Sequence, residues 1–345
     1  MGKIVGLDVG TMFIVSAIRI GGENKVEIKR MRNAFLPIPP DVLSSSEISK
    51  TELDYVETKN ERGETESLYL VGEDSFKFSN IFGQTVRRPM SKGVISPIEI
   101  GAIDVITLMV EKLIGRARKG FCVYSIPAEP VDIGIAPILY HEKVFGKILE
   151  NLGYEAKPLN EGLSIIFSEC QKEKFGGISV GFGCGLSNVC CAYKGTPALT
   201  FSISRGGDWI DDNTAKSLGT ISNRVTAIKE KGFYLENPST GNRKEKRIKE
   251  ALYFYYESLI KYVLSCIVGK FEESSDNLQI DEKIPMVISG GTSLPKGFIK
   301  IFKDIFSQFK EFPYEISEIK SAKDPLTAVA QGSLIYAHWS KKKEE

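Results

Sequence analysis

Three glycine-rich turns, each at the end of an apolar stretch, constrain the fold of this 345-residue chain more than any other feature. The first occupies residues 8–11 after Ile4–Leu7, the second occupies 181–188, and the third occupies 288–297. Glycine allows sharp backbone turns and close approach of a ligand to the main chain. Because a strand, a glycine turn and strand-helix units occur in both halves, the sequence predicts a duplicated α/β protein.

Composition and charge exclude several classes of protein. Hydrophobic residues make up 42% of the chain and charged residues 26%, which is typical of a folded protein. Lys and Arg (45) nearly balance Asp and Glu (44), so no overall field favours nucleic acid as a partner. No apolar stretch approaches the roughly 20 residues that span a bilayer, and no leader precedes the first strand. We therefore expect a cytoplasmic protein.

The six cysteines and two histidines show no metal-ligand spacing. A zinc site is not expected, and the cysteines fit buried small side chains in a reducing compartment.

Hydrophobic periodicity predicts the main elements along the chain. Residues 35–66 are predicted to be surface loops or a small inserted subdomain, and the apolar stretch 131–139 fits a buried segment better than a membrane-touching loop. Strands are predicted at 4–7, 13–20 (closed by Gly21 and Gly22), 26–31, 68–72, 121–126, 178–180, 189–193, 199–204 and 285–289. Helices are predicted at 99–114, 140–152, 208–218, 222–231, 243–269, from 295 and at 325–338.

The first turn places Asp8 at the tip of a strand, just before Gly10 and Thr11. Backbone N–H groups in such a turn can hold phosphate, and a nearby carboxylate can hold the hydration shell of Mg²⁺. The same pattern also occurs as ordinary hairpin chemistry. Alone, this turn leaves both interpretations open.

The second and third turns suit the same kind of ligand. Gly181, Gly183 and Gly185 alternate between two apolar strands, and Gly290 and Gly291 separate a strand from a helix start. No Gly-Lys-Ser/Thr follows the second turn, so it is not a P-loop, and it does not match the Rossmann pattern. A phosphate or a planar ring could lie against such backbone, although a plain glycine turn is the alternative.

The three turns in this order resemble the actin-like ATPase superfamily, which also holds sugar kinases and the seventy-kilodalton chaperones, and most closely the bacterial actins of the MreB group. The matching stretches are residues 4–14, 88–95, 160–162, 178–193, 204–211, 290–297 and 324–332. The resemblance implies two duplicated α/β domains around a nucleotide cleft. Domain I would span 1–160 with an inserted subdomain at about 32–80, and domain II would span 161–345 with a small subdomain at about 212–283.

The resemblance also implies the roles of individual residues. Asp8 would hold Mg²⁺ through water, and Glu161 would orient the attacking water, although a solvated acid near a helix start is the alternative for Glu161. ATP or ADP would contact Gly10, Thr11, Met12, Phe13, Gly183, Cys184, Gly185, Leu186, Gly207, Asp208, Lys229, Gly290, Gly291 and Thr292. The preference for adenine over guanine stays open.

One position departs from the family pattern. The second hairpin of the family opens with an Asp that orders the Mg²⁺ hydration shell or the lytic water, and Gly181 stands there in this chain. No Asp or Glu occurs between Phe175 and Tyr193. We therefore expect nucleotide binding to persist and hydrolysis to be slow.

Two functions follow from the resemblance. The first is an ATP-binding, MreB-like bacterial or archaeal actin homologue that assembles with itself into filaments in a nucleotide-dependent way, with slow ATP hydrolysis. The second is a non-polymerising, nucleotide-sensing scaffold like the cell-division and pilus-assembly relatives. Membrane-associated partners at the inner face of the membrane are left open, and a nucleic-acid partner is not expected. A small-molecule kinase is disfavoured because no phospho-acceptor base is recognisable.

Overall fold

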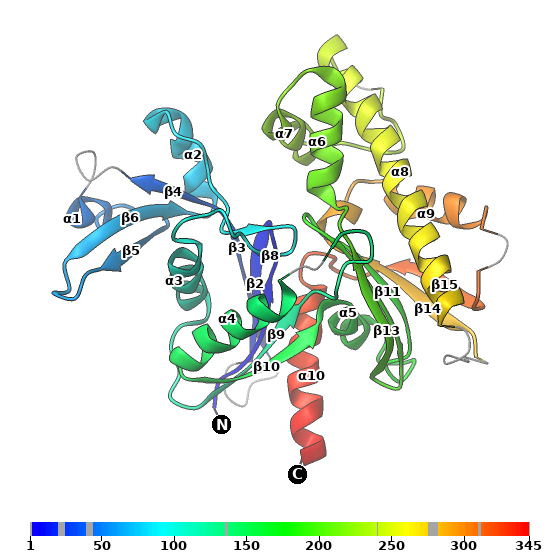
Figure 1. The fold of residues 1–345 in the computed structure, drawn as a ribbon, viewed down its shortest axis with the longest axis horizontal. Coiled ribbons are helices and arrows are strands. Elements are labelled where there is room, and N and C mark those ends of the chain that lie inside the picture. The colour runs from blue at the N-terminus through cyan, green and yellow to red at the C-terminus, as the bar shows by residue number, and fades with distance from the viewer. Residues whose placement is uncertain are drawn as a thin grey trace. The chain divides into compact units, whose positions relative to one another are not determined.

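The chain forms two compact units in the computed structural model, which describes residues 2–19, 25–38, 44–134, 137–239, 241–274, 282–309 and 312–344. Each unit is built around its own five-stranded sheet (Figure 1). Unit 1 contains residues 1–126, 137–159 and 333–345, and unit 2 contains residues 127–136 and 160–332. The domain boundaries expected from the sequence stay a prediction.

The sheet of unit 1 has the strand order β10-β9-β1-β2-β3. β1 pairs antiparallel with β2 and parallel with β9, which places the first glycine turn at the carboxyl end of β1. The strands are β1 (Ile4–Val9), β2 (Phe13–Arg19), β3 (Val26–Arg32), β9 (Gly120–Ile126) and β10 (Tyr154–Asn160). The predicted strand end at Ile20 and the turn at Gly21 and Gly22 lie outside the described residues.

Two helices of unit 1, α3 (Ala102–Ile114) and α4 (Ile138–Asn151), share a hydrophobic core with β1, β2 and β9. Both predicted helices are thus confirmed, with α3 starting later than expected because Gly101 adopts a left-handed conformation (φ 77°) at its start.

Strands within residues 35–38 and 55–71 form a second, smaller sheet with the order β4-β6-β5. Of the two expectations for this region, loops or a folded insert, the structure has the folded one. The elements here are β4 (Phe35–Ile38), α1 (Ser45–Ile48), β5 (Tyr55–Lys59) and β6 (Thr65–Val71), followed by α2 (Glu73–Phe82), β7 (Met90–Ser91) and β8 (Val94–Ile95).

The sheet of unit 2 repeats the arrangement, with the order β13-β12-β11-β14-β15. β11 pairs antiparallel with β12 and parallel with β14, so the second glycine turn lies at the carboxyl end of β11, beside the turn after β14. The strands are β11 (Gly177–Phe182), β12 (Ser187–Tyr193), β13 (Thr196–Ile203), β14 (Ile284–Ser289) and β15 (Ile316–Ser321). The helices are α5 (Glu161–Glu169), α6 (Gly207–Leu218), α7 (Ser222–Glu230), α8 (Arg243–Glu273), the 3₁₀ turn η1 (Gly291–Ser293) and α9 (Phe298–Phe306). The last helix, α10 (Ala328–Glu344), begins in unit 2, and from Ser333 on it belongs to unit 1.

The two faces of β11 pack against different helices, as the period of two in a strand requires. Val180 and Phe182 join the core that includes α8 and α9. Ser179 faces α5 instead, where its hydroxyl donates to the Gly162 carbonyl at 2.7 Å. Gly181 lies on this second face, so a side chain at position 181 would point toward α5.

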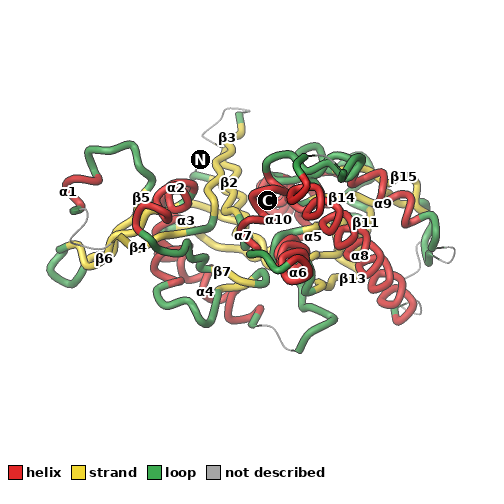
Figure 2. Tube along the Cα trace, turned by 90° about the horizontal axis from the view of Figure 1, so that it is seen from above, coloured by secondary structure: helices red, strands yellow, loops and turns green. Residues whose placement is uncertain are grey.

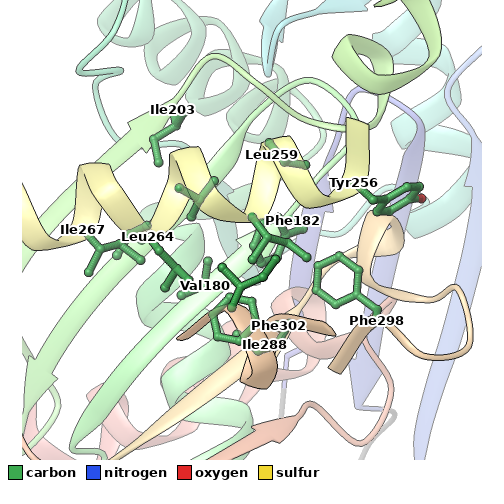
Figure 3. Close-up of a cluster of buried hydrophobic side chains, with 14 of the residues drawn as sticks. Val180, Phe182, Ile203, Tyr256, Leu259, Leu264, Ile267, Ile288, Phe298 and Phe302 are labelled. Atoms are coloured by element: carbon green, nitrogen blue, oxygen red, sulfur yellow. The ribbon is translucent and has the colours of Figure 1, made fainter. Parts of the chain in front are cut away.

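The long helix α8 runs along the sheet of unit 2 (Figure 2) and supplies much of its core. Leu259, Leu264 and Ile267 of α8 belong to one core with Val180 of β11 and Ile288 of β14 (Figure 3). Contrary to the expectation from the sequence, α8 is long and apolar enough by length and composition to cross a membrane, alone among the described helices. Part of this helix, including Leu259, Leu264 and Ile267, is buried in the core of unit 2.

The expectation that residues 131–139 are buried is wrong for most of that stretch. Val131, Ile133 and Leu139 are exposed, whereas Ile138 is buried at the start of α4. Residues 135 and 136 lie outside the described part of the chain. Val131 lies at the edge of the sheet, where its amide donates to the Ser202 carbonyl of β13 at 2.9 Å and its side chain stays exposed.

His141 makes the stability of unit 1 sensitive to acid. Its ring is buried against Phe145, its Nδ1 accepts a hydrogen bond from the Ile95 amide, and burial lowers its pKa to about 4. The unfolded chain binds this proton near pH 6.5, so the stabilisation is complete above that pH and is lost as the pH falls toward 4. We expect a loss on the order of 3 kcal/mol in the free energy of unfolding across this range.

Denaturant titrations followed through Trp339, in a Trp209→Phe background, measure this loss between pH 7 and pH 4.5. His141→Asn keeps a neutral acceptor and should flatten the pH dependence. An unchanged pH slope in this variant contradicts the assignment.

Candidate functional site

The turn between β1 and β2 leaves two adjacent backbone amides available. The Gly10 amide closes the turn, and its carbonyl accepts from the Asn33 side-chain amide at 2.8 Å. The Gly93 amide donates to the Thr11 hydroxyl at 2.9 Å. The amides of Thr11 and Met12 donate no hydrogen bond within the part of the chain that the structure describes. Neighbouring N–H groups of this kind form an anion-binding concavity.

Phe13 differs from the other predicted residues of this turn because it is the first residue of β2 and pairs with Arg32 of β3. The guanidinium groups of Arg30 and Arg32 lie 5.0 Å and 5.1 Å from the centre of its ring. Its ring therefore helps to fix the end of the hairpin, and its predicted contact with phosphate stays a prediction.

Asp8 is the only carboxylate of β1, and it faces β9. The Ser125 hydroxyl donates to Asp8 Oδ1 at 2.8 Å. Burial raises the pKa of Asp8 to about 6, while the Ser125 hydrogen bond opposes that rise, so the group is mostly ionised at neutral pH. Among the described residues no group of three or more His, Cys, Asp or Glu side chains could hold a metal by itself.

In unit 2 three predicted segments converge on the carbonyl of Gly183. This carbonyl accepts hydrogen bonds from the Gly207 amide at 3.0 Å and from the Thr292 hydroxyl at 2.8 Å. The next residue, Cys184, continues the contact, with its carbonyl accepting from the Asp208 amide at 2.9 Å and its thiol 3.1 Å from Asp208 Oδ1. The second hairpin, the start of α6 and the turn after β14 are thus one cluster.

The glycines of this cluster allow its close packing. A Cβ at Gly207 would lie 2.7 Å from Thr292 Oγ1, and a Cβ at Gly290 would lie 2.2 Å from the Phe182 carbonyl oxygen. Gly290 also has a φ of 89°, which favours glycine. Gly291 has more room, with Leu326 as its nearest neighbour at 3.2 Å.

The turn between β11 and β12 also has a backbone amide that is available to a ligand. The Gly183 amide donates across the turn to the Leu186 carbonyl at 2.9 Å. The Gly185 amide donates no hydrogen bond within the described residues. Its N–H group is therefore available to a ligand, as in the first turn.

Lys229 lies next to this cluster and forms a buried ion pair with Asp211. Its Nζ is 2.7 Å from both carboxylate oxygens of Asp211 and 3.5 Å from the position of a Cβ on Gly207. Asp211 also accepts from the Thr226 hydroxyl at 2.6 Å. Burial lowers the pKa of Lys229, but Tyr256 and Asp211 raise it by more, so the ammonium stays charged.

Two asparagines, Asn160 and Asn188, hold Glu161 in place. Glu161 is the first residue of α5, where the Asn160 side chain caps the helix by accepting from the Leu163 amide at 3.1 Å. The Asn188 side-chain amide donates to Glu161 Oε2 at 2.7 Å, and Asn188 Oδ1 accepts from the Ala128 amide at 3.2 Å. Asn188 is therefore held at both ends and orients the carboxylate.

Gly181 lies directly opposite Asn188 in the β11–β12 ladder. Its φ lies outside the left-handed range, so the backbone accepts other residues there. A Cβ at this position would meet Ile165 Cδ1 of α5 at 3.0 Å. A carboxylate at 181 would thus point toward the helix that begins with Glu161, at the cost of a small shift of Ile165.

A family model described as Volactin matches residues 4–337 of the chain. The chain belongs to the Volactin family. A comparison with curated protein sequences finds no match. The actin-like resemblance of this Volactin family member is tested by solved structures instead.

Several solved structures share the fold of this Volactin-family chain at low sequence identity. A MamK double helical filament is 17% identical to this chain, with a TM-score of 0.67. The match covers 97% of this chain and 98% of the MamK chain. MreB5 of Spiroplasma citri bound to AMPPNP is 14% identical, with a TM-score of 0.66 and coverages of 99% and 98%. The ethanolamine utilization protein EutJ from Carboxydothermus hydrogenoformans is 16% identical, with a TM-score of 0.55 and coverages of 97% and 90%. The predicted actin-like fold is confirmed.

Sequence reasoning missed the residues that hold the predicted ones in place. Asn33, Ser125, Asn188 and Asp211 are polar, and all four are buried, with two or fewer side-chain hydrogen-bond partners each. Each reaches its partner over at least 18 residues of chain, so no local pattern indicates the contact. A polar residue inside an apolar strand, as at Asn188, is the one signal that could have pointed to them.

Breaking the buried pair on one side should destabilise unit 2. Lys229→Met leaves the Asp211 carboxylate buried without its cation, and we expect a loss of about 3 to 5 kcal/mol in the free energy of unfolding. The double variant Lys229→Met/Asp211→Leu removes both charges and should recover most of that loss. Denaturant unfolding followed through Trp209, in a Trp339→Phe background, measures both. A double variant as unstable as Lys229→Met would show that lost packing, not the charge, is responsible.

Proposed function

We propose that this Volactin-family chain binds ATP and ADP with Mg²⁺, hydrolyses ATP slowly and assembles with itself into nucleotide-dependent filaments. The observation that carries the proposal is the convergence of three predicted segments on the Gly183 carbonyl in unit 2. The open amides of Thr11 and Met12 in unit 1 and of Gly185 in unit 2 support it.

Nucleotide binding would rely mainly on backbone. The open amides would hold phosphate oxygens, as N–H groups in glycine turns do elsewhere. Gly207, Gly290 and Gly291 present main chain without side chains, which suits a flat ring or a ribose. MreB5 structures bound to ADP and to AMPPNP, from proteins of the same fold, are consistent with this ligand class.

Asp8 fits a role toward Mg²⁺. Mg²⁺ usually binds one or two carboxylates together with phosphate oxygens and water, and needs no dedicated cage of protein ligands. The bound ion would neutralise charge on the phosphates. The Ser125 hydrogen bond would orient the Asp8 carboxylate for that purpose.

Hydrolysis would depend on Glu161, held by Asn188. Glu161 would orient the attacking water by accepting a hydrogen bond from one of its O–H groups. The carboxylate expected at position 181 is replaced by glycine, and Asn188 opposite it supplies a neutral amide. Since an amide neither accepts a proton nor orders a metal's water shell as a carboxylate does, the rate would be low.

Assembly with itself is supported by the shared fold with a MamK filament. We place the protein in the cytoplasm with other copies of itself as partners, and leave contact with a membrane-associated complex as a secondary proposal. The alternative, a nucleotide-sensing scaffold that does not polymerise, is favoured by Gly181, since slow turnover gives a long-lived nucleotide state.

A side chain at Gly291 tests nucleotide binding. A Cβ at position 291 has only the Leu326 side chain within 4 Å, and Gly291→Val adds bulk where we expect the ligand. Calorimetric titration with Mg·ATP should show at least a hundredfold loss of affinity. Gly134→Val, where a Cβ meets open space, is the matched control and should bind like the wild type. Gly183 is a poorer test, because a Cβ there lies 2.8 Å from the Leu186 carbonyl oxygen and would disturb the hairpin itself.

Restoring the missing carboxylate tests the account of turnover. We expect Gly181→Asp to raise the rate of phosphate release by on the order of a hundredfold. Ile165→Val removes the atom that a Cβ would meet, so Gly181→Asp/Ile165→Val should be at least as fast. Gly181→Ala adds the same Cβ without the acid and should stay slow. Glu161→Gln should abolish the gain, and a gain that survives it would assign the catalytic acid elsewhere.

A further inference from the structure

Unit 2 carries a continuous strip of aromatic side chains around one arginine. The aromatic strip consists of Arg205, Trp209, Phe254, Tyr255 and Tyr262. Ring centres are 5.3 Å apart for Phe254 and Tyr255, and 5.7 Å apart for Tyr255 and Trp209. The guanidinium carbon of Arg205 lies 5.0 Å from the Trp209 ring centre and 3.5 Å from that of Tyr262. Phe254 is 61% exposed at one end of the strip.

Arg205 forms no ion pair with the described residues. The acid beside it, Asp132, accepts from the Ser204 amide at 2.8 Å and from the Tyr262 hydroxyl at 3.3 Å. Val131 and Ile133 flank Asp132 and are 37% and 42% exposed. An arginine already held against two rings loses little further freedom when a carboxylate binds it. The strip therefore suits a carboxylate set among apolar side chains.

Unit 1 carries a surface with that chemistry. The isoleucine patch consists of Ile98, Ile100, Ile103 and Asp104, at the start of α3. Ile98 is 89% exposed and Ile100 87%, the two highest values among the large hydrophobic residues described. The loop is fixed rather than open, because Glu99 within it forms an ion pair with Arg87. Two fixed isoleucines in water are typical of a contact surface.

The charge of the isoleucine patch indicates a protein partner. Asp104 is exposed and forms no ion pair with the described residues. Residues 96–104 contain Glu99 and Asp104 and no Lys or Arg, so an anionic bilayer would repel them. A cation set among apolar side chains would attract them. Arg205 in the aromatic strip is such a group on the same chain.

We propose that the isoleucine patch of one copy docks on the aromatic strip of the next copy, with Asp104 against Arg205. The two surfaces differ in kind, so each copy offers one of each, and the contact is heterologous and can propagate. The net charge of +1 leaves little overall repulsion between copies. This inference rests on the self-assembly part of the proposed function and names the surfaces that carry it.

Charge reversal on each side, followed by the swapped pair, tests the contact. With Mg·ATP present, Arg205→Glu and Asp104→Arg should each raise the critical concentration for sedimentation at least about tenfold. The double variant Arg205→Glu/Asp104→Arg should return it to within about threefold of the wild type. Lys261→Glu reverses an exposed charge next to Tyr262 but outside the strip, and should assemble normally. Calorimetry with Mg·ATP should show unchanged nucleotide affinity in all four variants.

The outcomes separate this contact from the proposed function. If the wild type assembles and both single reversals assemble equally well, the contact is wrong and the filament function stands. A double variant as defective as the singles also overturns it, since Arg205 and Asp104 then do not meet. A wild type that stays monomeric under all nucleotide conditions overturns both the assembly and the contact.

Discussion

The two hydrogen bonds accepted by the Gly183 carbonyl unite the candidate site of unit 2. The Gly207 amide comes from the start of α6 and the Thr292 hydroxyl from the turn after β14, and Thr292 lies 109 residues beyond Gly183 in the chain. These contacts require glycine, because a Cβ at Gly207 or Gly290 would collide with the neighbouring segment. The buried Lys229–Asp211 ion pair lies against this cluster, with Lys229 Nζ 3.5 Å from the position of a Cβ on Gly207. The strand order, the positions of the glycines and the buried ion pair therefore act together to hold the site of unit 2 in place.

Much of this arrangement could be predicted from the sequence, because its strongest signals are local. The glycine turns at the ends of β1, β11 and β14 are visible as breaks in apolar runs, and α8 begins at residue 243 as its periodicity predicts. Elements with weaker patterns were missed. β10 contains Lys157 and Pro158, and β15 has an apolar residue only at every third position, so pairing with the neighbouring strand of the sheet rather than propensity makes them strands.

The candidate site was predictable in its backbone parts and not in its supporting side chains. The predicted Gly207, Asp208 and Thr292 come together with the second hairpin because glycine spacing carries that information. The partners Asn188 for Glu161 and Asp211 for Lys229 depend on distances across the fold, which no sequence window contains. Asn188 lies opposite Gly181, and its side-chain amide donates to Glu161, so a neutral hydrogen bond stands opposite the position where the resemblance predicts an acid.

The most direct test of the account is an equilibrium titration of the wild-type protein with ATP, once with Mg²⁺ and once with a chelator. We predict binding in both conditions, because the open amides at residues 11, 12 and 185 need no metal, and tighter binding with Mg²⁺, because Asp8 holds the ion through its water shell. Asp8→Ala should remove the difference between the two conditions while leaving the metal-free affinity unchanged. No binding of ATP under either condition would contradict the account at its centre.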